Sequence, residues 1–216
     1  GLVGSLLDVQ RIGVMLDPVK EARHIYRTKY REGYRPGGVS NSLLIKGMKA
    51  ILYKEKSIKN WPVYTQPKLH GIRMLCQNNV SKDVFTRISM RSWLNNPFTH
   101  LTHIEDELMD FFEYLPQNSV LDGELYNHNL TFSTLTSIIK RSKKTHPNLS
   151  QIQYWIFDIN YHDGDGTPYE KRYALLVNAF YRYMEDRSPI GDCMDVTVLP
   201  KTFIIVPVQV ANNHQD

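Results

Sequence analysis

Short apolar strand patterns alternate with amphipathic helical patterns along this chain, and this alternation constrains the fold more than any other feature. Aliphatic, β-branched and aromatic runs predict strands at 73–77, 84–87, 120–126, 154–159, 196–198 and 203–210. Apolar residues at helical spacing, with start and stop signals, predict helices at 18–31, 102–114, 131–141 and 168–184. The first two strands are expected to pair as a hairpin. The fold class is therefore α/β (α+β), with both helices and sheet.

The stretch T-Q-P-K-L-H-G-I-R, which contains Lys68, is the best candidate for chemistry. Gly71 permits a tight turn or a close backbone approach, and Arg73 begins a strand pattern. Burial and a neighbouring cation both favour a neutral lysine amine, and a neutral amine is a nucleophile. A surface lysine beside a β-turn is the alternative, because short K-x-x-G matches are common.

Two later strand patterns carry further candidates. Glu124 stands in the middle of the apolar strand L-D-G-E-L-Y, where a carboxylate is costly unless it is paired or bound to a metal. This cost favours a Mg²⁺-binding or ribose-binding role for Glu124. Phe157 lies in the strongly apolar run Y-W-I-F-D-I, where an ordinary core position is the alternative to a binding role. The helix at 131–141 is expected to turn Phe132 inward with three aliphatic neighbours.

Composition narrows the class of protein. Hydrophobic residues make up 42% and charged residues 22% of the 216, which is typical of a globular chain. The two cysteines argue against a disulfide scaffold, and no apolar run approaches the length of a membrane span. A net charge of +4 is compatible with a polyanionic partner. Since no signal peptide is recognisable, an intracellular location (nuclear, cytoplasmic or viral) is expected.

Three stretches of this chain resemble motifs of the covalent nucleotidyltransferases, the superfamily of DNA ligases, RNA ligases and mRNA capping enzymes. They are K-L-H-G-I-R, L-D-G-E-L-Y and Y-W-I-F-D-I, and they occur in the order that the family has. The resemblance is strongest to ATP-dependent DNA ligases of the compact viral or phage kind. It implies a ligase adenylation domain, ATP-grasp-like, with antiparallel and mixed sheets flanked by helices. The nucleotide is then expected between the sheets. It also implies a DNA ligase of replication and repair that uses ATP and Mg²⁺.

The resemblance assigns roles to six residues. Lys68 attacks the α-phosphate of ATP and forms lysyl-AMP; AMP then passes to the 5′-phosphate of nicked double-stranded DNA, and a 3′-hydroxyl seals the strand. Arg73 and Arg87 neutralise phosphate charge, and Glu124 binds Mg²⁺. The remaining two residues bind the base: Gln66 contacts the edge of adenine, and the ring of Phe157 stacks on it.

Two departures from the family pattern leave alternatives open. His70 stands where most DNA ligases have Asp and some RNA ligases have His, so an RNA ligase is the main alternative. A GTP-using capping enzyme and a non-catalytic nucleic-acid-binding relative are the others. The family's later E-G and K-x-K motifs and its OB-fold domain do not appear. The chain, which begins with Gly, is therefore expected to be a fragment: a basic helical extension at 1–58 and a truncated adenylation domain at 59–216, acting as a monomer.

Overall fold

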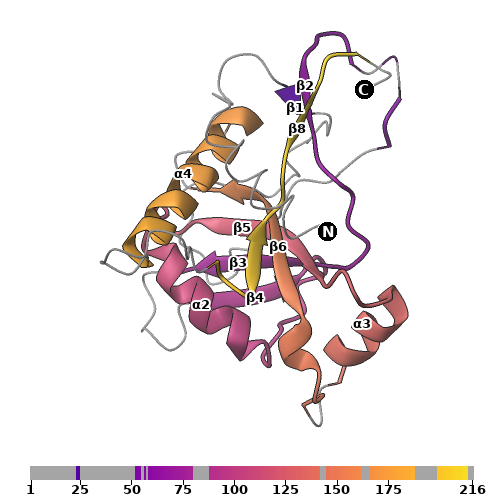
Figure 1. The fold of residues 1–216 in the computed structure, drawn as a ribbon, viewed down its shortest axis with the longest axis vertical. Helices are drawn as coiled ribbons and strands as arrows, with labels where there is room; N and C mark the ends of the chain where they lie inside the picture. Colours follow the sequence, from indigo (N-terminus) through magenta and orange to yellow (C-terminus); the bar gives the residue numbers. More distant parts are fainter. Residues whose placement is uncertain are drawn as a thin grey trace, which may run out of the picture.

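The computed structural model describes residues 23–24, 52–54, 56, 58–79, 88–141, 145–161, 166–187 and 199–213. Within these residues the chain forms a larger and a smaller sheet with helices packed around them (Figure 1). The predicted α/β class, with antiparallel and mixed sheets, is confirmed. None of the described helices has the length and apolar character needed to cross a bilayer.

The larger sheet has five strands in the order β4-β3-β5-β6-β7. The strands are β3 (Ile72–Asn78), β4 (Ile88–Ser92), β5 (Val120–Tyr126), β6 (Gln153–Asn160) and β7 (Phe203–Ile205). All neighbours are antiparallel except β6 and β7, which are parallel. The bounds of β5 coincide with the predicted strand, and β6 lies inside the sheet as a strongly apolar strand should.

The smaller sheet has the order β1-β2-β8 and contains β1 (Arg23–His24), β2 (Val63–Thr65) and β8 (Gln209–Ala211). The predicted helix at 18–31 is wrong at Arg23 and His24, because these residues pair in parallel with Val63 and Tyr64 of β2. The backbone N–H and C=O groups of a helix bond to each other, whereas those of a strand bond to a neighbouring strand. Here residues 23 and 24 bond to β2, which is distant in the sequence. The rest of that predicted helix lies outside the described residues.

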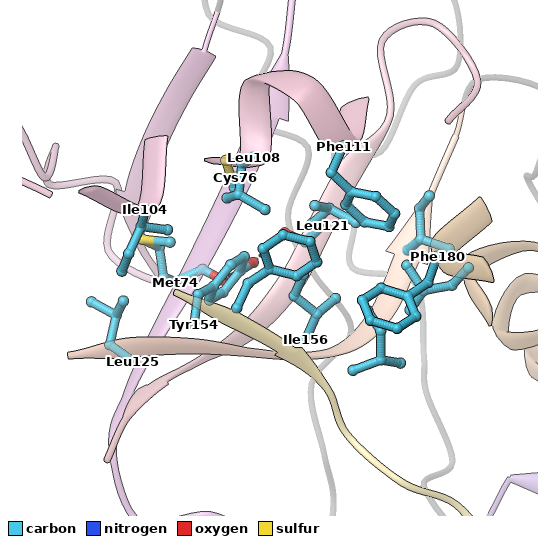
Figure 2. Packing of buried hydrophobic residues seen from close by; sticks show 14 of the residues in the cluster. Met74, Cys76, Ile104, Leu108, Phe111, Leu121, Leu125, Tyr154, Ile156 and Phe180 are labelled. Carbon is cyan, nitrogen blue, oxygen red and sulfur yellow. Dashed lines mark hydrogen bonds between the residues drawn. The ribbon is translucent and has the colours of Figure 1, made fainter. Parts of the chain in front are cut away.

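Helices α2 (Thr102–Phe112) and α4 (Tyr169–Arg187) bury their apolar sides against one face of the larger sheet. Figure 2 shows Ile104, Leu108 and Phe111 of α2 and Phe180 of α4 packed over side chains from β3, β5 and β6. Figure 1 places α3 (Phe132–Ile139) at the other end of the molecule from the smaller sheet. Thr131 caps α3, its side chain accepting a hydrogen bond from the backbone N–H of Thr134.

Three predicted elements differ in detail from the structure. The hairpin partner of β3 is Ile88–Ser92 rather than 84–87, which lies outside the described residues, as does the strand predicted at 196–198. The single run predicted at 203–210 is divided between β7 and β8, which belong to different sheets. Phe132 does not turn inward: its side chain is 42% exposed.

Candidate active site

The larger sheet has one apolar face and one polar face, and the candidate residues gather on the polar face. Strand register places side chains in rows across the sheet, because directly paired residues share a face. One row pairs Arg73 of β3 with Glu124 of β5 and Glu124 with Trp155 of β6. The next row joins four residues across β4, β3, β5 and β6: Arg91, Leu75, Asp122 and Asp158. Charged groups from four strands are therefore brought together.

Lys68 is exposed in the segment that leads from β2 into β3, immediately before this face. Three residues later, the backbone N–H of Gly71 donates to Glu124 Oε1 at 3.1 Å. A Cβ atom on Gly71 would lie 2.2 Å from the carbonyl oxygen of Leu125, so only glycine allows this approach. The K-x-x-G spacing thus fixes the lysine segment against Glu124.

Glu124 is half-buried, and burial raises the pKa of its carboxyl to about 7. The Gly71 N–H and the charges of Arg73 and Lys68 oppose this rise, whereas Asp122 adds to it. A carboxyl with this pKa changes charge close to neutral pH. Lys68 is thus among the charged groups that lower the pKa of Glu124, although its effect is the smallest of them.

The guanidinium of Arg73 is held by an ion pair and lies over two aromatic rings. Its Nε and one terminal nitrogen donate to the two oxygens of Asp122, at 2.9 and 2.6 Å. Its Cζ atom lies 4.3 Å from the ring centroid of Trp93 and 5.6 Å from that of Phe157. Burial alone would lower the pKa of Arg73, but Asp122, Glu124 and Asp158 outweigh this effect and raise it. Arg73 is therefore a fixed, permanent positive charge.

Phe157 reaches the site because β6 contains an irregularity at this residue. The register with β5 shifts between Asp122 and Gly123, which pair with Asp158 and Ile156, and Phe157 is left over. Such a bulge re-aims a side chain and frees a backbone group. Here the carbonyl oxygen of Phe157 accepts hydrogen bonds from Gln66 Nε2 at 3.3 Å and from the Tyr169 hydroxyl at 3.0 Å. Phe157 is thus a partly exposed ring, not an ordinary core position.

Gln66 connects the two sheets. Besides Phe157, its Nε2 donates to the carbonyl oxygen of Val206 at 3.4 Å. Since Gln66 follows β2 of the smaller sheet and its partners lie in β6 and beyond β7, the amide joins both sides of the site. Its predicted contact with an adenine edge stays a prediction.

A second buried ion pair, between Asp158 and Arg172 of α4, lies beside the first. Two nitrogens of Arg172 donate to the two oxygens of Asp158, each at 3.0 Å, and a third donates to the carbonyl oxygen of Thr167. The residues Asp122, Asp158 and Arg172 are 1%, 4% and 3% exposed. Asp122 and Asp158, like Glu124, are carboxylates inside apolar strands, where a carboxylate needs a partner. The sequence motifs indicate Glu124 and miss these two aspartates.

The structure brings five of the six predicted site residues to this region: Lys68, Gln66, Arg73, Glu124 and Phe157. Arg87 lies outside the described residues. His70 is exposed, and its ring stacks on the ring of Phe132, with centroids 4.4 Å apart and an interplanar angle of 7°. This contact ties the lysine segment to α3 and explains why Phe132 is not buried.

The described residues contain no group of three or more His, Cys, Asp or Glu side chains that could hold a metal ion. Asp122 is engaged by Arg73, which leaves Glu124 as the carboxylate beside Lys68. One carboxylate fits an ion such as Mg²⁺ when a substrate supplies phosphate oxygens as further ligands. The donor set therefore suits a metal brought with a nucleotide better than a metal held by protein alone.

Solved structures resemble this fold. The structure named Pmar-Lig_PreS3 matches with a TM-score of 0.50 and 20% identity, over 69% of this chain and 31% of that one. The chain has the fold of the ligase nucleotidyltransferase domain. Chlorella virus DNA ligase-adenylate (TM-score 0.45, 21% identity) matches over 75% of this chain and 48% of its own. The ATP complex of the bacteriophage T7 ATP-dependent DNA ligase (0.43, 10%) matches over 71% and 50%.

At these identities the likeness concerns the fold, so the resemblance predicted from the three motifs is confirmed at that level. No family model matches the sequence, and no curated protein matches it either. The chain spans half or less of the length of each of these three solved proteins.

Proposed function

We propose that this chain carries the adenylyltransferase chemistry of an ATP-dependent DNA ligase, with Lys68 as the nucleophile. The observation that carries the proposal is the Gly71–Glu124 hydrogen bond, which sets an exposed lysine beside a partly buried carboxylate. Arg73 and the ring of Phe157 lie on the same face. An amine, a fixed cation and a ring face within one site are what attack on a nucleotide phosphate requires.

In the proposed first step the neutral amine of Lys68 attacks the α-phosphorus of ATP. A nitrogen–phosphorus bond forms, the bond to the bridging oxygen breaks, and pyrophosphate leaves with that electron pair while the amine loses its proton to solvent. Arg73 stabilises the negative charge that develops on the phosphate oxygens. Phe157 offers its ring to the base, and Gln66 stands near the same ring through its bond to the Phe157 carbonyl.

Glu124 is the residue that would hold Mg²⁺. When bound, the ion supplies charge neutralisation at the phosphates. Arg87 is proposed as a second phosphate contact from the sequence resemblance alone. The proposed acceptor of AMP is the 5′-phosphate of nicked DNA, in an intracellular, monomeric enzyme whose chain divides into an extension at 1–58 and an adenylation domain from 59.

An RNA ligase is the second candidate because of one specific observation. His70 occupies the position of the usual aspartate, and its exposed ring is stacked on Phe132 beside Lys68. An exposed flat pair at this position changes what an incoming strand end meets. Competition between nicked DNA and nicked RNA for the adenylylated protein separates the two candidates.

The deciding experiment is incubation with α-labelled ATP and Mg²⁺, beside α-labelled GTP. We expect label that remains on the protein after denaturation with ATP, little with GTP, and none in Lys68→Ala. Lys59→Ala, at an exposed lysine of the described part, is the matched control and should label like wild type. Label from GTP in preference to ATP would instead indicate capping chemistry. Label that survives in Lys68→Ala would rule out Lys68 as the nucleophile.

A further inference from the structure

Trp93 lies in a tightly hydrogen-bonded turn at the end of β4. Ser92 N–H donates to the Asn96 carbonyl at 2.8 Å, Asn95 N–H to the Ser92 carbonyl at 2.9 Å, and Asn96 N–H to Ser92 Oγ at 3.1 Å. Asn95 has a φ of 71°, a left-handed conformation that asparagine tolerates. The backbone that carries Trp93 is therefore well defined by its own sequence.

This turn delivers the indole ring to the polar face of the sheet. Ser92 is the register partner of Met74, so the next residue along β4 comes beside Arg73 of β3. The ring centroid of Trp93 lies 4.3 Å from Arg73 Cζ, closer than the ring of Phe157. The adjacent Leu94 is 80% exposed, whereas Trp93 is half-buried against the arginine.

The contact supplies a constraint that the Asp122 ion pair lacks. Two parallel hydrogen bonds fix the edge of the guanidinium, but the plane can still tilt about the line joining the two carboxylate oxygens. The ring of Trp93, with Arg73 Cζ 4.3 Å above its centroid, packs against the guanidinium and opposes this tilt. The orientation of Arg73 thus depends on Asp122 of β5 and on Trp93 in the turn after β4.

We propose that Trp93 is a positioning residue that holds the guanidinium of Arg73 in the orientation used towards the nucleotide phosphates. That Arg73 acts on nucleotide phosphates rests on the proposed adenylyltransferase function. That Trp93 holds Arg73 in place does not depend on that function. Trp93 acts through Arg73, so its removal should matter only while the arginine is present.

The first test measures exchange of the Arg73 Nε proton with water by NMR, the resonance being assigned by its loss in Arg73→Lys. We expect exchange to accelerate about tenfold in Trp93→Ala and in Trp93→Leu, which lack a flat ring, and less than about threefold in Trp93→Phe. Leu94→Ala, one residue along the same turn, should match wild type. Unchanged exchange in both Trp93→Ala and Trp93→Leu would overturn the proposal.

The second test measures the rate of lysyl-AMP formation at saturating ATP. We expect a loss of about tenfold in Trp93→Leu, recovery in Trp93→Phe, and no further loss when Trp93→Leu is added to Arg73→Lys. Losses that multiply in the double variant would show that Trp93 does not act through Arg73. A wild-type chain that forms no adduct removes the proposed function alone, because the exchange measurement needs no ATP and still decides whether Trp93 holds Arg73.

Discussion

At the scale of single residues, Glu124 links folding to pH. Its pKa of about 7 in the folded protein exceeds the unfolded value of about 4.3, so the folded state binds the proton more tightly. Stability is therefore lost as pH rises from about 4.3 towards 7. We expect Glu124→Gln, which avoids a desolvated charge, to raise the free energy of unfolding at pH 8 by about 1–3 kcal/mol and to change it little at pH 4.5.

Urea unfolding in the presence of EDTA at the two pH values measures this effect. Glu185→Gln, at an exposed carboxylate on α4, is the control and should follow the wild-type pH dependence. A Glu124→Gln protein whose stability changes with pH as much as that of wild type would show that Glu124 is not the group responsible.

Gly71 is the second residue at which a single atom decides the geometry. An added Cβ would lie 2.2 Å from the Leu125 carbonyl oxygen and 2.8 Å from Glu124 Cγ, so the lysine segment has to move. We expect Gly71→Ala to destabilise the protein by about 1–3 kcal/mol, as overpacking does. Gly166→Ala has open space but a φ of 75°, so it should cost about 1 kcal/mol or less. Equal costs in thermal unfolding would contradict the steric explanation.

At the scale of elements, strand patterns could be predicted from the sequence better than their partners could. The bounds of β5 follow from local composition, because apolar residues occur at both ends of this seven-residue strand. The hairpin partner of β3 begins at Ile88, later than its composition predicts, since the length of the turn is not encoded in strand composition. Phe132 fits the helical spacing of buried residues, yet it is exposed because it stacks on His70 from a distant segment.

In the candidate site too, local motifs could be predicted from the sequence, but contacts between distant segments could not. Lys68, Glu124 and Phe157 stand in recognisable motifs, so their proximity could be expected from the order of those motifs. The bulge that frees the Phe157 carbonyl could not, because it depends on register with β5. Gly123 lies at this bulge, where a Cβ atom would be 2.4 Å from the Trp155 carbonyl oxygen. The glycine is therefore the one local feature of the sequence that fits the bulge. Arg172, 14 residues beyond Asp158 and on another element, carries no sequence signal of its pairing.

The Asp158–Arg172 pair is a buried polar link between β6 and α4, and it leads to a prediction about these elements. Removing one partner of a buried pair leaves an uncompensated charge, so Arg172→Met should destabilise by about 3–5 kcal/mol. Adding Asp158→Asn, which keeps an acceptor for the Ile159 N–H, should restore at least part of the loss. Arg182→Met on the exposed side of α4 is the control. If chemical unfolding shows no rescue in the double variant, an unpaired charge on Asp158 is not the cause of the destabilisation in Arg172→Met.

At the scale of the whole molecule, the two sheets share one core, so we expect them to unfold together. Tyr64 of the smaller sheet is 2% exposed, and its ring packs on those of Tyr169 and Tyr173 of α4, with centroids 6.0 and 6.4 Å away. Helix α4 in turn covers the larger sheet. The smaller sheet is therefore anchored to the larger one through aromatic rings as well as through Gln66.

We expect Tyr64→Ala to lower the free energy of unfolding by about 3–5 kcal/mol, the usual cost of deleting a buried aromatic ring. Because the core is shared, hydrogen exchange followed by mass spectrometry should accelerate in peptides from β5 as well as from β2, by the same free energy. Leu52→Ala, at a side chain that is 88% exposed, should change stability by less than about 0.5 kcal/mol. Acceleration confined to β2 would mean that the smaller sheet opens by itself, and Lys68, which follows β2, would then move with it.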